Sequence, residues 1–188
     1  ILYIKNMSDN YSLIIKNGSC YIDGKLIKSD IGLYENKIQK IGNLEENNCK
    51  VYDASGKVVL PGIIDTQVHF REPGSTDAED LESGSRAAVL GGVTSLFEMP
   101  NTNPPTANLV EFEKKLKAAK NRMHSNYAFY FGATPQNTEQ LAQLKNLEGC
   151  CGVKLFAGSS TGNLLVDKEA DIELSLIHIS EPTRRSMI

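Results

Sequence analysis

The stretch "VVLPGIIDTQVHF" at residues 58–70 is an almost continuous apolar run that ends in polar side chains. Runs of this kind are typical of a strand in a parallel sheet that is buried on both faces. Helix-length segments and further strand-like runs follow it in alternation: 76–92, 93–101, 108–123, 126–134, 138–147 and 151–160. In 108–123, Asn108 can cap the start of a helix, and one helical face carries Leu109, Phe112, Leu116 and Ala119. This alternation predicts an α/β protein with a parallel sheet. Four βα units are half of a (β/α)₈ barrel or all of a small doubly wound sheet, and the pattern alone does not separate the two.

The segment before this stretch has a different pattern of apolar and turn residues. Short apolar runs between residues 10 and 58 are separated by turn residues, and the pairs Asn17-Gly18 and Asp23-Gly24 are typical of hairpins because both residue types accept positive φ. We therefore expect a small antiparallel β module over residues 1–58. Met7 is the expected start, which would make residues 1–6 a leader without structural meaning.

Composition narrows the class of protein. The net charge is only −3, so no broad field favours a nucleic acid or an anionic membrane as partner. No apolar run approaches the roughly 18 residues that span a bilayer, and no signal-peptide pattern is present. We expect a cytoplasmic protein that acts on a small molecule. The four cysteines form no C-x-x-C pair and are expected to be reduced.

Polar side chains gather where the expected strands end. Gln67, His69 and Arg71 alternate at the end of the first strand, Asn101 leaves the second, and Lys154 stands in the fourth. In parallel α/β sheets, chemistry gathers at the carboxyl ends of the strands. Taken singly, these residues also suit a structural histidine, a surface ion pair of Arg71 with its neighbour, and an ordinary turn. A charged lysine between apolar neighbours needs a partner or a changed protonation state.

Three motifs resemble one family. They are "DTQVHFREPG" at 65–74, "GGVTSLFEMPNTNP" at 91–104 and "GVKLFAGSSTG" at 152–162, and in this order they resemble the longer-chain dihydroorotases of the amidohydrolase superfamily. The resemblance covers about residues 11–173. It implies a metal-dependent (β/α)₈ TIM-like barrel, of which residues 59–173 would be the first four βα units, preceded by a small β-sandwich module. The implied reaction is the reversible cyclisation of N-carbamoyl-L-aspartate to L-dihydroorotate in pyrimidine biosynthesis.

The resemblance also implies roles for individual residues. His69 matches a metal ligand, and Lys154 matches a lysine that carries a carbamate and bridges two metals. Arg71 and Asn101 match residues that hold the carboxylate of the substrate. The implied cofactor is one or two Zn²⁺ ions, with Mn²⁺ or Co²⁺ as alternatives. The implied general base is an aspartate on the eighth strand, beyond the end of this chain, so the fragment is expected to be inactive alone.

Gln67 departs from the family pattern, because relatives usually carry a histidine there. A glutamine offers an amide oxygen, which is a weaker zinc ligand than an imidazole nitrogen. Either one metal binds weakly, or the amide binds it directly or through water, or the protein is a noncatalytic subunit that assembles with aspartate transcarbamoylase. We favour altered metal binding with activity retained. A homo-oligomer is the other expected assembly.

A relative acting on allantoin or hydantoin is a further alternative. Arg71 and Asn101 disfavour it, since allantoinases usually carry asparagine at the position of Arg71. The tail "LSLIHISEPTRRSMI" at 174–188 resembles a translated sequencing adapter, and we assign it no function. His178 is excluded as a ligand although its "IHI" setting looks like a strand, and His124 receives no role.

Overall fold

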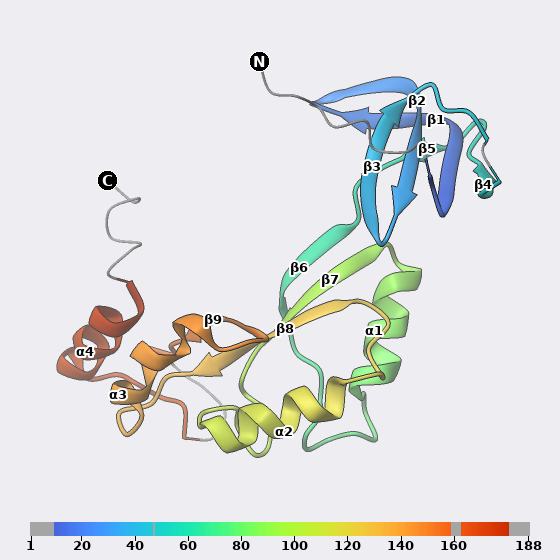
Figure 1. Cartoon of the computed structure of the whole chain (residues 1–188). Helices are drawn as coiled ribbons and strands as arrows, with labels where there is room; N and C mark the ends of the chain where they lie inside the picture. The colour runs from blue at the N-terminus through green and yellow to red at the C-terminus, as the bar shows by residue number, and fades with distance from the viewer. Residues whose placement is uncertain (1–9, 47, 159–162, 181–188) are drawn as a thin grey trace. The chain divides into compact units, whose positions relative to one another are not determined.

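The computed structural model describes residues 10–46, 48–158 and 163–180. The chain divides into two compact units between Pro61 and Gly62, which are described separately (Figure 1). The expected start at Met7, the leader at 1–6 and the end of the tail at 181–188 lie outside the described residues.

The first unit is a five-stranded sheet in the order β3-β2-β1-β4, with β5 also paired to β1. The strands are β1 (Leu13–Ile22), β2 (Lys25–Tyr34), β3 (Lys37–Gly42), β4 (Lys50–Asp53) and β5 (Val58–Val59). The first three strands form antiparallel hairpins, whereas β4 and β5 run parallel to β1. The prediction of a purely antiparallel module was therefore wrong. The chain after β3 crosses to the far side of β1 and does not turn back beside β3.

The two predicted hairpin turns have different outcomes. Asp23 and Gly24 have φ values of 48° and 79° and join β1 to β2. The prediction of a hairpin turn at Asp23-Gly24 is therefore confirmed. Asn17 also has a positive φ, of 62°, but it lies inside β1, where the register shifts between Ile15 and Gly18. This pair forms a bulge, and a Cβ added at Gly18 would lie 2.6 Å from Val59 Cγ2. Glycine at this position is what lets β5 approach β1.

The second unit contains a parallel sheet in the order β6-β7-β8-β9. Its elements are β6 (Ile63–Val68), α1 (Leu81–Leu90), β7 (Val93–Glu98), α2 (Leu109–Ala119), β8 (Asn126–Gly132), α3 (Thr138–Leu141), the 3₁₀ helix η1 (Ala142–Asn146), β9 (Cys150–Lys154) and α4 (Glu169–Ser180). Strand and helix alternate in chain order, which confirms the predicted α/β class.

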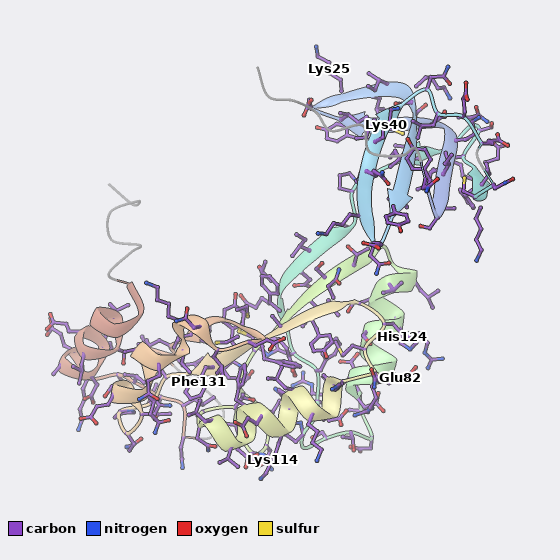
Figure 2. The ribbon with its side chains drawn as sticks, viewed as in Figure 1. Lys25, Lys40, Glu82, Lys114, His124 and Phe131 are labelled. Atoms are coloured by element: carbon purple, nitrogen blue, oxygen red, sulfur yellow. The ribbon has the colours of Figure 1, made fainter. Side chains whose placement is uncertain are left out.

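Helices cover one face of this sheet. Figure 1 shows α1 and α2 on the same side of it. The core on that side joins Leu81 of α1 and Phe112 of α2 to Leu96, Phe129 and Phe131 of the strands, and the last of these is labelled in Figure 2. Side chains alternate along a strand, so the intervening residues point to the opposite face.

That opposite face carries Phe97 and Tyr130, whose rings meet edge to face with centroids 6.5 Å apart. Both side chains are half-buried. It is the face that would point inward if the sheet curved into a barrel.

Side chains cap the starts of α1 and α2, but only α2 begins where the sequence predicts. The side chain of Asn108 accepts a hydrogen bond from Glu111 N at 2.9 Å, which confirms it as the cap of α2. Phe112 and Ala119 on the predicted apolar face of α2 are fully buried. α1 begins at Leu81, five residues after the expected start at 76, and Asp80 and Ser83 form a reciprocal cap there.

Two predicted boundaries differ from the structure. The run at 58–70 is not one strand: β5 pairs with β1 in the first unit, and β6 begins only after Pro61. This proline has no backbone N–H for a ladder, which favours a break. The predicted tail at 174–188 begins inside α4, so the backbone of His178 is helical although "IHI" resembles a strand.

Candidate functional site

The predicted site residues stand at one edge of the parallel sheet. His69 follows the last residue of β6, Asn101 lies three residues after β7, and Lys154 is the last residue of β9. Because the strands are parallel, their carboxyl ends share an edge. Val68, Leu96 and Val153 pack on the helix side, so alternation places His69 and Lys154 on the opposite face.

His69 and Asn101 are in direct contact. The imidazole Nδ1 lies 2.9 Å from the side-chain oxygen Oδ1 of Asn101. The backbone supports this contact, since Met99 N donates to Val68 O at 2.9 Å and so ties the ends of β6 and β7 together. The imidazole is exposed, and the asparagine is half-buried.

Arg71 does not pair with the carboxylate beside it. Glu72 instead binds Arg122, at the end of α2, through two bonds of 2.7 and 3.0 Å, and its Oε2 also accepts from Leu81 N at 3.0 Å. The bonds to Arg122 are the main reason that the pKa of Glu72 lies below its usual range, and the bond from Leu81 N lowers it further. Arg71 is exposed and makes no ion pair within the described part of the chain. The surface-pair interpretation of Arg71 was wrong.

A hollow of about 460 Å³ lies between the loops that follow β6 and β7. The first loop lines it with Phe70, Arg71, Pro73, Gly74 and Ser75, and the second with Asn101, Thr102, Asn103 and Pro105. Its polar side chains include Arg71 and Asn101, which the sequence predicted to act together. The structure thus brings a guanidinium and an amide, two kinds of hydrogen-bond donor that can bind a carboxylate, to one cavity.

Lys154 and Gln67 stand apart from this hollow. The Lys154 ammonium lies 5.2 Å from the centroid of the Phe156 ring, and no carboxylate of the described residues is within ion-pair distance. Gln67 is exposed, and its backbone N–H donates to Asp65 Oδ1 at 2.9 Å. β6 and β9 are the outer strands of the sheet, about 14 Å apart along it at the usual strand spacing. No hydrogen bond or ion pair joins His69 to Lys154 in the described ranges.

Two of the side chains at this edge are of kinds that could contribute to a metal site. An imidazole suits zinc, and an uncompensated lysine on the same face is a group that a carbamate would turn into an oxygen ligand. Among the residues that the structure describes, no three His, Cys, Asp or Glu side chains converge as a ligand set. His69 and Lys154 would hold a metal only together with further groups.

The sequence analysis missed a buried ion pair. Lys115 of α2 and Glu98 of β7 are each 1% exposed, with Nζ 3.0 Å from Oε2. Apart from this ion pair, neither carboxylate oxygen has a hydrogen-bond partner within the described residues. Burial, which Lys115 offsets only in part, raises the pKa of Glu98 to about 7, and burial lowers the pKa of Lys115. Lys115 also donates to Thr102 Oγ1 at 3.5 Å, beside Asn101.

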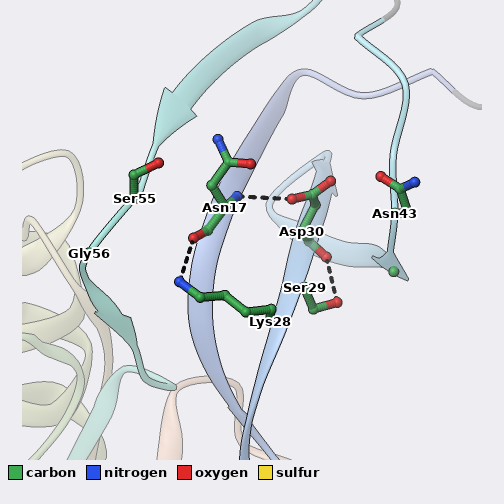
Figure 3. A pocket seen from close by; sticks show the side chains of 8 residues that line it. Asn17, Lys28, Ser29, Asp30, Asn43, Ser55 and Gly56 are labelled. Carbon is green, nitrogen blue, oxygen red and sulfur yellow. Dashed lines mark hydrogen bonds between the residues drawn. The ribbon is translucent and has the colours of Figure 1, made fainter.

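Two other features have structural explanations. His124 Nε2 lies 2.8 Å from Glu82 Oε1 of α1, and Figure 2 labels both. In the first unit a hollow of about 470 Å³ contains Asp30, whose carboxylate accepts from Asn17 N and Leu44 N at 3.0 and 3.1 Å (Figure 3). That carboxylate fastens the bulge of β1 to the segment after β3.

Comparison with known proteins identifies the class. Residues 58–174 match the Amidohydrolase family, and the chain belongs to this family. It is similar to a dihydroorotase of Methanosarcina mazei, with 38% identity over 88% of this chain and 36% of that protein. An allantoinase of Desulfitobacterium hafniense is 38% identical over 79% of this chain and 33% of that protein.

Solved structures agree on the architecture. L-hydantoinase (dihydropyrimidinase) from Arthrobacter aurescens superposes with a TM-score of 0.77 and 26% identity, covering 89% of this chain and 38% of that structure. The chain thus has the fold of the first part of an amidohydrolase TIM-barrel enzyme and spans about a third of the length of its relatives. No helix of the described residues is long and apolar enough to cross a membrane.

Proposed function

We propose that this chain is part of a dihydroorotase that interconverts N-carbamoyl-L-aspartate and L-dihydroorotate in pyrimidine biosynthesis. The observation that carries the proposal is the hollow that both Asn101 and Arg71 line, with Arg71 not paired to Glu72. Both substrates carry a carboxylate, which a guanidinium can bind through two parallel hydrogen bonds. The similarity to dihydroorotases supports the same reading.

A second candidate is an allantoinase, since one such relative is as similar to this chain as the dihydroorotases are. Allantoin has no carboxylate, and an arginine facing the hollow would have no anion to bind. Arg71 therefore favours dihydroorotate. The third candidate, a noncatalytic subunit of an aspartate transcarbamoylase assembly, is favoured only by Gln67.

The cofactor belongs to the proposal. We propose that His69 and a carbamate on Lys154 hold one or two zinc ions, or manganese or cobalt, with ligands from outside this chain. When bound, such an ion supplies a hydroxide near neutral pH by lowering the pKa of water to about 7. This chain's own contribution would be to hold the carboxylate of the substrate at Arg71 and Asn101. A cytoplasmic location and a homo-oligomer or transcarbamoylase assembly are part of the same proposal.

Substrate assays test this proposal in the full-length protein, meaning the product of the uninterrupted reading frame. We expect turnover of L-dihydroorotate in preference to allantoin and hydantoin. Arg71→Met should raise KM for dihydroorotate by about 10- to 100-fold, since a charge-assisted hydrogen bond contributes about 1.5–3 kcal/mol.

Arg86→Met is the matched control, because Arg86 is an exposed arginine of α1 whose partner is Glu82. It should leave KM unchanged. Preferred turnover of allantoin by the parent protein would reject the dihydroorotase assignment, and no turnover of any of the three cyclic amides would favour the noncatalytic subunit.

Gln67→His tests the altered metal site. An imidazole in place of the amide restores the ligand that relatives usually carry, so the zinc retained per chain after desalting should rise, as elemental analysis would measure. Gln143→His, on the exposed side of η1, controls for a histidine added elsewhere. Equal zinc in the Gln67→His variant and the parent would show that residue 67 does not contribute to metal binding.

A further inference from the structure

The contact between His69 and Asn101 determines which imidazole nitrogen carries the proton. Nδ1 lies 2.9 Å from Oδ1, and an amide oxygen can only accept a hydrogen bond. Nδ1 must therefore be the donor in the neutral ring. The lone pair is then on Nε2, which is the nitrogen left to bind a metal or a proton.

Hydrogen bonds within the loop that follows β7 hold the backbone on both sides of Asn101. Thr102 N and Thr106 N both donate to Pro100 O at 2.9 Å, and Thr102 Oγ1 donates to Pro104 O at 2.9 Å. Lys115 reaches the same hydroxyl from α2 at 3.5 Å. These bonds hold the backbone of the loop after β7 and so keep Asn101 beside His69.

The other half of the amide is available to a ligand. Asn101 lines the hollow beside Arg71, and among the described residues its Nδ2 has no protein acceptor. One amide group therefore serves two neighbours: its oxygen accepts from the imidazole, and its nitrogen can donate to an anion in the hollow.

We propose that Asn101 is the positioning residue of His69, fixing its Nδ1-protonated tautomer and linking it to the anion held beside Arg71. The tautomer follows from the contact alone, whereas the link to a substrate carboxylate rests on the proposed function. Groups that bind the second nitrogen of a metal-ligating histidine fix its tautomer and orientation, and their loss typically weakens metal binding about 10- to 100-fold.

The test is nitrogen NMR, at about pH 8, of full-length protein labelled with ¹⁵N-histidine and freed of metal. His69→Gln assigns the signal. We expect the parent protein to show His69 protonated at Nδ1, and Asn101→Ala to lose this preference. Asn101→Asp, which keeps an acceptor oxygen, should retain it.

Asn103→Ala is the matched control, because Asn103 lines the same hollow without bonding His69. It should leave the tautomer unchanged. A parent protein protonated at Nε2, as a reversed amide would give, overturns the inference, and so does an unchanged tautomer in Asn101→Ala.

Titration with zinc chloride alone gives a second readout. Asn101→Ala should weaken zinc binding about 10- to 100-fold, while Asn103→Ala should not. Equal zinc affinity in the parent and Asn101→Ala would refute the positioning role. The expected tautomers combined with no turnover of any cyclic amide would instead reject the proposed function and leave the tautomer assignment standing.

Discussion

Replacing Lys115 with methionine is expected to lower the free energy of unfolding by about 3–5 kcal/mol near pH 8, the usual cost of leaving one buried charge unpaired. Lys115 is the cationic partner of Glu98, and both side chains are 1% exposed. Methionine has a similar length and fills the space, so the loss measures the stranded carboxylate and not a cavity. Denaturant unfolding of the full-length protein, followed by circular dichroism, measures it.

The pH dependence of this loss follows from Glu98. Its folded pKa of about 7 lies above the ordinary value of 4.5, so between these values the folded state holds a proton that the unfolded state has released. Protonated Glu98 therefore adds to the free energy of unfolding. This contribution is complete below about pH 4.5 and is lost as the pH rises through about 7. Without Lys115 the pKa of Glu98 rises further. The deficit of Lys115→Met should thus be large at pH 8 and shrink or vanish at pH 5.

Two further variants keep the result interpretable. Lys114→Met removes a neighbouring lysine that is 67% exposed and paired with Glu111, and it should change stability by less than about 0.5 kcal/mol. The double variant Glu98→Gln/Lys115→Met should recover much of the loss and lose its dependence on pH between 5 and 8, since no buried ionisable group remains there. A deficit in Lys115→Met that is equal at both pH values would contradict the stranded-carboxylate explanation.

Lys154→Met is expected to lower kcat of the full-length protein by about 100-fold or more, because loss of even an indirect metal partner typically costs 10- to 100-fold. Stability should change little, since the ammonium has only the ring of Phe156 beside it among the described residues. Steady-state kinetics and thermal unfolding of the same preparations separate the two effects.

Lys145→Met provides the control, since it removes an exposed lysine from η1. It should affect neither kcat nor the unfolding temperature. Nearly full turnover in Lys154→Met would remove Lys154 from the proposed site, and a lowered unfolding temperature would assign it a structural role instead.

Much of the second unit could be predicted from the sequence because its signals are local. The apolar spacing of α2 and the cap at Asn108 determine that helix without help from the rest of the chain. The turn at Asp23-Gly24 is local in the same way. Asn17-Gly18 carries the same signal, but strand pairing on both sides of β1 overrides it and makes it a bulge.

Features that depend on distant partners could not be predicted. Arg71 and Arg122 are equally able to pair with Glu72, and only the packing of α2 against the loop after β6 decides for Arg122. Lys115 lies three residues after Phe112 and four before Ala119, on the buried face of α2, although its charge alone would not indicate burial. Glu98 lies two residues after Leu96 in β7, so its side chain points to the same face of the sheet. The signal that could have revealed the pair was a negative charge at Glu98 and a positive charge at Lys115, each on an otherwise apolar face.

The hydrogen bonds that Glu72 accepts from Arg122 and from Leu81 N, the first N–H of α1, have a consequence for ligand affinity. They tie the loop that carries Arg71 to both helices, so that loop is held in shape before any ligand arrives. The loop then loses its conformational entropy when the protein folds. It has little more to lose when an anion binds, so the same contacts with the anion give a higher affinity. In this chain, tight recognition would depend on a carboxylate that never touches the ligand.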